Sequence, residues 1–228
     1  IYESATGGNI KVTGVNVTVS TTAANLTFDN GDLVLSADGT TTISTGSTGG
    51  NIQIDGKIDG TTGTGNGSEA LVLSSGTGTT TVDGAIGSGT ALTTITIGSA
   101  GTGAIELDDI GDGSGYGASG AVAVGNTATA TLTPDGTVYS TDSTQTYVAK
   151  AGQNIDITDA STFTTTNDAI EFSTAGVDLI NGNAGGAHTV TVNTGTGAGA
   201  VTFGAAIETD GNDDDTLTIT SGTGTVTF

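Results

Sequence analysis

The chain has 228 residues with 40 glycines, 1 proline and no methionine or tryptophan, and 34% of its residues are hydrophobic, which leaves little apolar bulk for a broad globular core. Cysteine is absent, which excludes a small disulfide-stabilised domain. Asp and Glu number 24 against 3 Lys, so the net charge is −21; this sign repels nucleic acid and anionic membranes, and no apolar run approaches the ~20 residues of a membrane helix.

The N-terminal part of the chain predicts a series of short strands. Its apolar runs are rich in branched side chains, which favour extended structure. Two dipeptides that are typical of turns, Asn30-Gly31 and Asp38-Gly39, separate the later runs, and they also fit β-hairpins, which would build a β-sandwich. The runs are residues 10–12, 15–17, 26–28 and 33–35.

A strand, a Gly-Thr-Gly corner and a second strand recur four times further along the chain. The first strands begin at Leu71 and Ile95, and again at Val190 and Leu217. A strand unit that repeats at a period of roughly two dozen residues is typical of a solenoid whose coils stack on one another. The corners are residues 76–78, 101–103, 195–197 and 222–224.

Each coil is expected to have three faces. Apolar and polar side chains alternate within a strand, as in residues 95–97, which places isoleucine inward and threonine outward. A short apolar tail follows the second strand, as in residues 83–86 and 204–207. Three faces per turn predict a triangular cross-section, with parallel pairing between coils ~4.8 Å apart and about nine or ten coils in a rod of roughly 45 Å.

The segment 108–140 is the least regular part of the chain. Residues 111–120 read GDGSGYGASG and predict a flexible stretch. Residues 134–136, Pro-Asp-Gly, lie between two short strand-like runs and predict a hairpin turn that projects from the rod. The expected organisation is solenoid coils over 1–107, an irregular excursion over 108–140 and further coils over 141–228.

Together these patterns predict an all-β chain that forms a parallel β-solenoid of stacked coils. The alternative is one or two β-sandwich domains of surface-layer or fibre type.

Three acidic clusters are candidate calcium sites, because hard cations prefer several oxygen ligands on a flexible backbone. The middle cluster is spaced somewhat like a calcium loop but lacks the Glu that ends an EF-hand loop. The last one has a faint similarity to the nonapeptide calcium repeat, in a single copy. Solvated turns are the alternative interpretation of all three. The candidate ligands are Asp29, Asp32, Asp108, Asp109, Asp112, Asp213, Asp214 and Asp215.

Catalysis is not expected. The chain has one histidine, His188, which is expected at a surface or turn, and it has no cysteine or arginine. No catalytic residue and no cofactor other than structural calcium is predicted. The alternative is a carbohydrate-active β-helix enzyme, in which paired carboxylates would act on a neutral glycoside.

Three segments resemble bacterial β-strand-repeat surface proteins, the filamentous-haemagglutinin-like and related type V secreted adhesins. These segments are residues 50–56, 144–147 and 189–197. The resemblance implies a right-handed parallel β-helix, an extracellular or cell-surface location, and a role in adhesion or matrix.

The expected function is therefore that of an extracellular structural protein, a repeat segment or subunit of a bacterial surface adhesin or of a self-assembling filament. A surface-layer protein is an alternative. The expected partners are further copies of the chain, end to end or side by side, and a host or surface glycan. Nucleic acid and membrane insertion are not expected.

Overall fold

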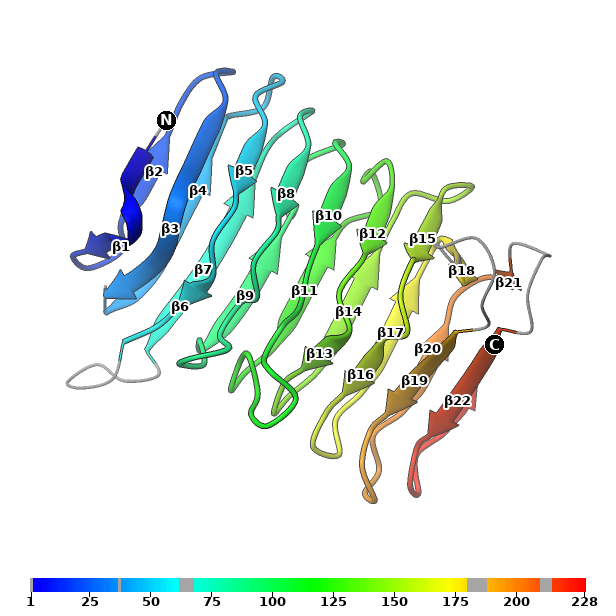
Figure 1. The fold of residues 1–228 in the computed structure, drawn as a ribbon. Helices are drawn as coiled ribbons and strands as arrows, with labels where there is room; N and C mark the ends of the chain where they lie inside the picture. The colour runs from blue at the N-terminus through cyan, green and yellow to red at the C-terminus, as the bar shows by residue number, and fades with distance from the viewer. Residues whose placement is uncertain (1, 37, 62–67, 180–187, 210–214) are drawn as a thin grey trace.

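The computed structural model of the chain describes residues 2–36, 38–61, 68–179, 188–209 and 215–228. These residues form 23 strands and contain no helix, and therefore no helix that could cross a membrane. The strands wind into a right-handed parallel β-solenoid of about eight turns, whose coils follow one another from the N-terminus to the C-terminus (Figure 1). The predicted β-helix is confirmed, and a sandwich does not form because strands pair in parallel with those of the preceding and following coils.

Three sheets run along the rod. The first sheet consists of β1 (Tyr2–Thr13), β3 (Leu26–Ser36), β5 (Ile52–Ile54), β8 (Thr80–Val82), β10 (Ile105–Leu107), β12 (Leu132–Pro134), β15 (Asn154–Ile157), β18 (Gly176–Leu179) and β21 (Ile207–Thr209), with β6 (Ile58–Asp59) paired to β3. The second consists of β2 (Thr18–Ser20), β4 (Gly39–Ser44), β7 (Glu69–Ser74), β9 (Thr94–Ile97), β11 (Val122–Gly125), β14 (Gln145–Val148), β17 (Ile170–Ser173), β20 (Val201–Phe203) and β23 (Val226–Thr227). The third consists of β13 (Val138–Ser140), β16 (Thr162–Thr164), β19 (Thr189–Asn193) and β22 (Thr216–Thr220).

Several coils are longer than the sequence repeats indicated. Leu71 and Ile95, whose spacing suggested the period, are indeed in register on successive strands. Ile43 and Leu73 are also in register, as are Phe172 and Phe203, and both of these pairs are further apart in the chain. About eight coils therefore form in place of nine or ten, which corresponds to a rod of ~38 Å at the usual strand spacing.

The interior of the rod changes in character along its length. Phe28 stacks on Tyr2 at the N-terminal end, the coils that follow are filled by aliphatic side chains, and the C-terminal coils stack aromatic rings. In the second sheet the rings of successive coils lie face to face, with centroids 5.3 and 5.2 Å apart, and a further pair stacks in the third sheet at 4.6 Å. These rings are buried, and stacked aromatic pairs add to the stabilisation that burial provides. The second-sheet rings are Tyr147, Phe172 and Phe203, and the third-sheet rings are Tyr139 and Phe163.

A buried amide is accommodated among these rings. Gln145 is inward-facing on β14 and 1% exposed. Its Nε2 donates to the carbonyl oxygens of Tyr139 and Thr164, at 2.9 and 2.7 Å. Its Oε1 accepts a hydrogen bond from the hydroxyl of Tyr147 at 2.9 Å. The donors and acceptor of this side chain are thus satisfied without water.

The Gly-Thr-Gly corners are glycine-rich because neighbouring coils touch there. The first glycine of three corners, Gly76, Gly195 and Gly222, has φ of +60°, +79° and +54°, a conformation that side chains disfavour. A Cβ on Gly103 would lie 1.7 Å from the carbonyl oxygen of Gly78 in the preceding coil. Glycine therefore permits both the turn and the close stacking of one corner on the next.

The hairpin predicted at residues 134–136 does not form. The strands on its two sides, β12 and β13, belong to different sheets and pair with neighbouring coils instead of with each other. Pro134-Asp135-Gly136 is a corner of the rod. The segment 108–140 contains β11, β12 and β13, one strand of each of the same three sheets, and residues 111–117 leave the regular path between bridges at Ile110 and Ala118.

Candidate functional site

The histidine of the chain is part of a contact between two coils. His188 precedes β19 and Asp215 precedes β22, and the pairing of these strands stacks the two residues. His188 Nδ1 lies 3.0 Å from Asp215 Oδ1, and the backbone N–H of His188 donates to the same oxygen at 3.2 Å. His188 is 8% exposed and directly precedes β19, so of the two positions expected from the sequence, a surface or a turn, the surface position is wrong. This arrangement presents no exposed general base.

The two aspartates of the first predicted metal cluster both lie within β3 but at different positions. Asp29 directly follows the inward-facing Phe28, whereas Asp32 Oδ1 accepts a hydrogen bond from the backbone N–H of Lys57 at 3.1 Å. Asp32 and Asp55 line a hollow of about 280 Å³ together with glycines of adjacent coils. The carboxylate of Asp32 thus ties one coil to the next.

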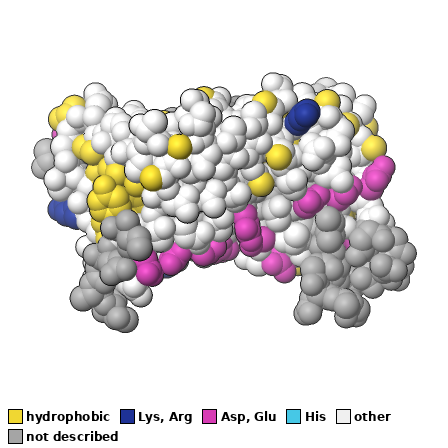
Figure 2. All heavy atoms as spheres, turned by 90° about the horizontal axis from the view of Figure 1, so that it is seen from above, with side chains coloured by type: hydrophobic (Ala, Val, Ile, Leu, Met, Phe, Trp, Pro, Cys, Tyr) yellow, Lys and Arg dark blue, Asp and Glu magenta, His cyan; other side chains and the backbone are white. Residues whose placement is uncertain are grey.

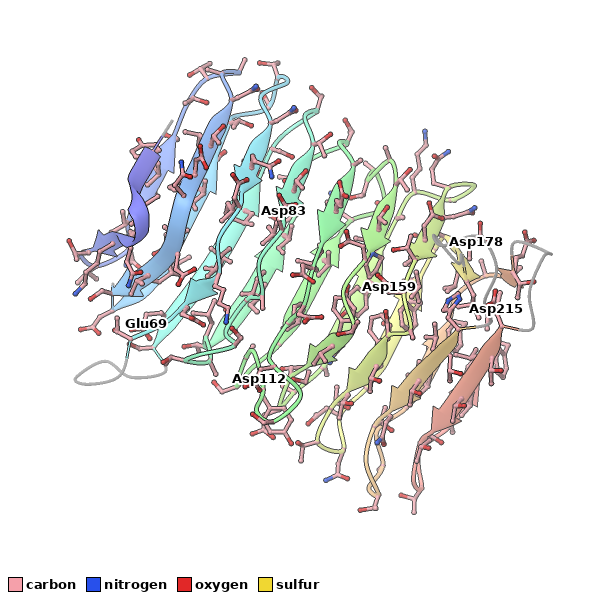
Figure 3. All side chains as sticks on the ribbon, viewed as in Figure 1. Glu69, Asp83, Asp112, Asp159, Asp178 and Asp215 are labelled. Carbon is pink, nitrogen blue, oxygen red and sulfur yellow. The ribbon has the colours of Figure 1, made fainter. Side chains whose placement is uncertain are left out.

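The three aspartates of the second cluster also act separately. Asp109 Oδ1 accepts hydrogen bonds from the backbone N–H groups of Thr137 and Val138 at 2.6 and 2.7 Å. Asp112 lies in the loop of residues 111–117 beside the third sheet, and its carboxylate caps residues of that loop (Figure 3). Asp108 directly follows the end of β10 and is only partly exposed.

Of the third cluster, Asp213 and Asp214 lie outside the described residues, and Asp215 contacts His188 as above. Among the residues that the structure describes, no three His, Asp or Glu side chains gather closely enough to hold a metal ion. Structural calcium therefore stays a prediction.

The structure brings together a different set of carboxylates, here called the aspartate column. Each member comes directly after the last inward-facing residue of a strand in the first sheet. In the longer strand β3 it comes after the equivalent inward-facing residue. The members belong to five successive coils. The backbone N–H of each later member donates to the coil before, for example Asp108 to Val82 at 3.0 Å and Asp135 to Leu107 at 3.0 Å. Acidic side chains accordingly form a band along the rod (Figure 2). The column consists of Asp29, Asp55, Asp83, Asp108 and Asp135.

Acidic residues on the strands themselves widen this band. Asp156 on β15 is in register with Asp178 on β18, which is in register with Glu208 on β21. Glu106 occupies the corresponding outward position of β10. Successive parallel strands are ~4.8 Å apart, so carboxylates of like charge are held near one another by the backbone pairing.

Burial and mutual repulsion raise the pKa of several of these groups. Partial burial, followed by the charges of Glu106, Asp108 and Asp83, raises the pKa of Asp135 from 3.8 to about 6. Burial is also the largest cause that raises the pKa of Asp108, and neighbouring aspartates add to it. One buried oxygen of Asp135 has no hydrogen-bond partner among the described residues, which adds to the cost of its ionised form.

The aspartate column was missed in the sequence although its signal is present. The signal is an aspartate directly after an apolar strand residue, repeated from coil to coil, as in Ile54-Asp55 and Val82-Asp83. The uneven spacing of the coils hides it from any search at a fixed period.

A buried glutamate was also missed. Glu69 begins β7 and is 2% exposed. Its Oε1 accepts a hydrogen bond from the hydroxyl of Thr61 at 2.8 Å, and Oε2 has no partner among the described residues.

A groove lies where the loop of residues 111–117 leaves the rod. Its volume is about 480 Å³, within the range of small-ligand sites. Residues 113–116 form one wall, and β13 and β16 of the third sheet form the floor. The floor residues are Val138, Ser140, Thr162 and Thr164.

The loop that forms this groove is held at several points. Asp112 Oδ1 accepts hydrogen bonds from the backbone N–H groups of Ser114 and Gly115 at 2.9 and 2.8 Å, and hydrogen bonds from Ser114 and Gly115 lower the pKa of Asp112. The Ser140 hydroxyl donates to the carbonyl oxygen of Gly115 at 2.9 Å. The Tyr116 hydroxyl is hydrogen-bonded to the hydroxyl of Thr166, two coils further along. The loop is thereby fixed in place over the sheet.

No protein-family model, no curated protein and no solved structure matches this chain.

Proposed function

We propose that this chain is a structural segment of an extracellular surface protein, a rigid rod that belongs either to the stalk of a bacterial adhesin or to a self-assembling filament. The observation that carries the proposal is the unbroken stack. Two sheets run in parallel register through the coils from β1 to β21 and from β2 to β23. The described strands of each coil pair only with those of neighbouring coils, so the fold adds length and side surface with every repeat.

The charge distribution supports the same role. The aspartate column and the acidic strand residues place negative charge along the rod (Figure 2). Like-charged bands repel one another, which keeps rods apart on that side and preserves their solubility. The second sheet faces outward with mostly small uncharged residues, such as Thr42, Thr96 and Thr202, which are outward on β4, β9 and β20. Side-by-side association is accordingly expected through the second sheet.

The composition of the chain also favours resistance to proteolysis, which a surface protein needs. Trypsin-like proteases cleave after Lys or Arg, and the chain offers three lysines and no arginine. Lys11 lies within β1, and Lys57 adjoins β6, so two of the three sites are in or next to paired strands.

The location is tested by immunogold labelling of intact source cells with an antibody against this chain. Labelling of non-permeabilised cells, or of filaments detached from them, is expected. Labelling only after permeabilisation would overturn the proposal.

The form of the structure is tested by electron microscopy of the purified chain at increasing concentration, with calcium and then with a chelator. Long fibres would identify a filament subunit, and their loss on chelation would assign the acidic residues a bridging role. Dispersed single particles under all conditions, together with surface labelling, would identify a stalk segment.

A further inference from the structure

We infer that the groove between residues 113–116 and the third sheet binds a neutral saccharide. The groove has a volume of about 480 Å³, which is enough to enclose a small ligand. It is formed by one loop and by two strands that are part of a continuous sheet, and both parts are tied together by hydrogen bonds.

The chemistry of the groove favours an uncharged ligand with many hydroxyl groups. Thr162 and Thr164 supply hydroxyls that can both donate and accept a hydrogen bond, as sugar hydroxyls do. The hydroxyls of Ser114 and Ser140 already donate to Asp112 and to the carbonyl oxygen of Gly115, so they offer a ligand their acceptor lone pairs. None of the residues that line the groove is charged. In a chain of net charge −21, an anionic ligand would be repelled and would find no cation there.

Tyr116 supplies the apolar surface that sugar recognition requires. Its side chain is 40% exposed, unlike Tyr139 and Tyr147, which are buried in the core. The hydrogen bond between its hydroxyl and that of Thr166 fixes the far end of the ring. An aromatic ring held in this way offers a rigid face to the C–H groups of a sugar ring at little cost in conformational entropy.

The groove is built before any ligand arrives. Asp112 orders the loop through Ser114 and Gly115, and Ser140 anchors it to the floor. Gly111 and Gly113 have φ of +88° and +77°, which allows the sharp bends that this loop needs. Preorganisation of this kind lowers the entropy lost on binding.

A peptide ligand that adds a strand is disfavoured by the pairing of the floor. β16 pairs with β13 on one side and with β19 on the other, and Tyr139 of β13 is bridged to Ile110. The backbone groups below the groove are therefore already used, and side-chain hydroxyls are what the site presents.

The test is isothermal titration calorimetry with a panel of neutral oligosaccharides, namely cellohexaose, maltohexaose, chitohexaose and a galactose oligomer, against oligogalacturonate as the anionic comparison. At least one neutral oligomer is expected to bind with a dissociation constant of roughly 0.1 to 10 mM, typical of a small uncharged site. Tyr116→Ala is expected to weaken binding at least about tenfold, and Tyr116→Phe by no more than about threefold, because the ring face remains.

Two matched variants locate the site on the rod. Thr162→Val removes a hydroxyl of the floor, and Thr191→Val makes the same change at the position in register on the next coil, outside the groove. Thr162→Val is expected to weaken binding about threefold to tenfold, and Thr191→Val to leave it unchanged. Circular dichroism and thermal unfolding of each variant establish that the fold is intact.

The inference is overturned if no neutral oligomer binds at about 10 mM, if oligogalacturonate binds equally well, or if Tyr116→Ala and Thr162→Val bind like the wild type. It adds to the proposed function without depending on it. If the antibody labels the rod at the cell surface but the rod binds no sugar, this inference fails and the proposed function stands.

Discussion

Replacing Asp135 by Asn is expected to stabilise the protein at neutral pH. Asp135 stacks on Asp108 in the aspartate column, its carboxyl is partly buried, and one of its oxygens has no partner among the described residues. Asparagine keeps the shape of the side chain and removes the charge. The repulsion from Glu106, Asp108 and Asp83 then disappears, and each remaining carboxylate of the band loses one repulsive neighbour.

The size of the effect follows from the pKa of Asp135, which rises from 3.8 to about 6 in the folded protein. A shift of that size corresponds to at most ~3 kcal/mol of lost stability once the group is ionised. Because the carboxyl is only partly buried, solvent screens its interactions and we expect ~1 to 2 kcal/mol. For a chain of this length that corresponds to roughly 2 to 8 °C in Tm.

The sign of the pH dependence is also fixed by this shift. The folded state holds the proton of Asp135 more tightly than the unfolded chain does, so protonation favours folding. The contribution is fully present below the unfolded pKa of 3.8 and is lost as pH rises through the folded pKa of about 6. Asp108 and Asp156, whose pKa values are also raised by burial and neighbouring carboxylates, act in the same direction.

The assay is urea unfolding from pH 4 to 8 in chelator-containing buffer, followed by circular dichroism. The wild type is expected to lose stability between about pH 4 and 6, and Asp135→Asn to have a shallower profile and a higher stability at pH 7. Asp142 is an exposed aspartate away from the column, so Asp142→Asn is the matched control and should change neither the pH profile nor the stability at pH 7. A variant that is less stable than the wild type at pH 7, or that keeps the full pH slope, would refute the reasoning.

Three further outcomes are expected. Gln145→Leu should lower the free energy of urea unfolding by ~1 to 3 kcal/mol because it leaves the Tyr147 hydroxyl buried without its partner, and adding Tyr147→Phe should recover part of that loss. If the effects of the two substitutions simply add in the double variant, the hydrogen-bond network is contradicted. Gly103→Ala should lower the free energy of unfolding by more than ~2 kcal/mol because a Cβ would meet the carbonyl of Gly78. Gly152→Ala, with φ of +80° but nothing within 4 Å, should lower it by only ~1 kcal/mol, and equal effects of the two substitutions would argue against tight corner stacking. Millimolar calcium should raise Tm by several degrees at pH 7, with reversal by chelator and a smaller effect of magnesium, and an unchanged Tm would remove the case for structural calcium.

The fold could be predicted from the sequence because its signals are local. Alternation such as Ile95-Thr96-Ile97 identifies a strand with one buried face, and the glycine corners identify where the chain turns. Both are properties of a few adjacent residues. The number of coils was overestimated because some coils carry additional residues between their strands, as in the step from Ile43 to Leu73.

The candidate sites were harder to predict because they depend on register between coils. Asp29 and Asp135 belong to one column although they lie in distant parts of the sequence, and this relation exists only after the intervening coils have stacked. Conversely, Asp108, Asp109 and Asp112 are close in sequence and have three different environments. The groove at Tyr116 depends on residues 162–166, which come from a coil two turns further along.

The change from an aliphatic to an aromatic interior gives the rod one stretch that resists mechanical unfolding less and a C-terminal end that resists it more. Interfaces between successive coils are arranged in series, so a tensile load is carried equally by all of them and the weakest determines when the rod yields. The rings of Tyr147, Phe172 and Phe203 strengthen the C-terminal interfaces, while the coils around Ile43 and Leu73 rely on smaller side chains. A pulled rod should therefore give way first in its aliphatic coils and keep the aromatic coils folded until last.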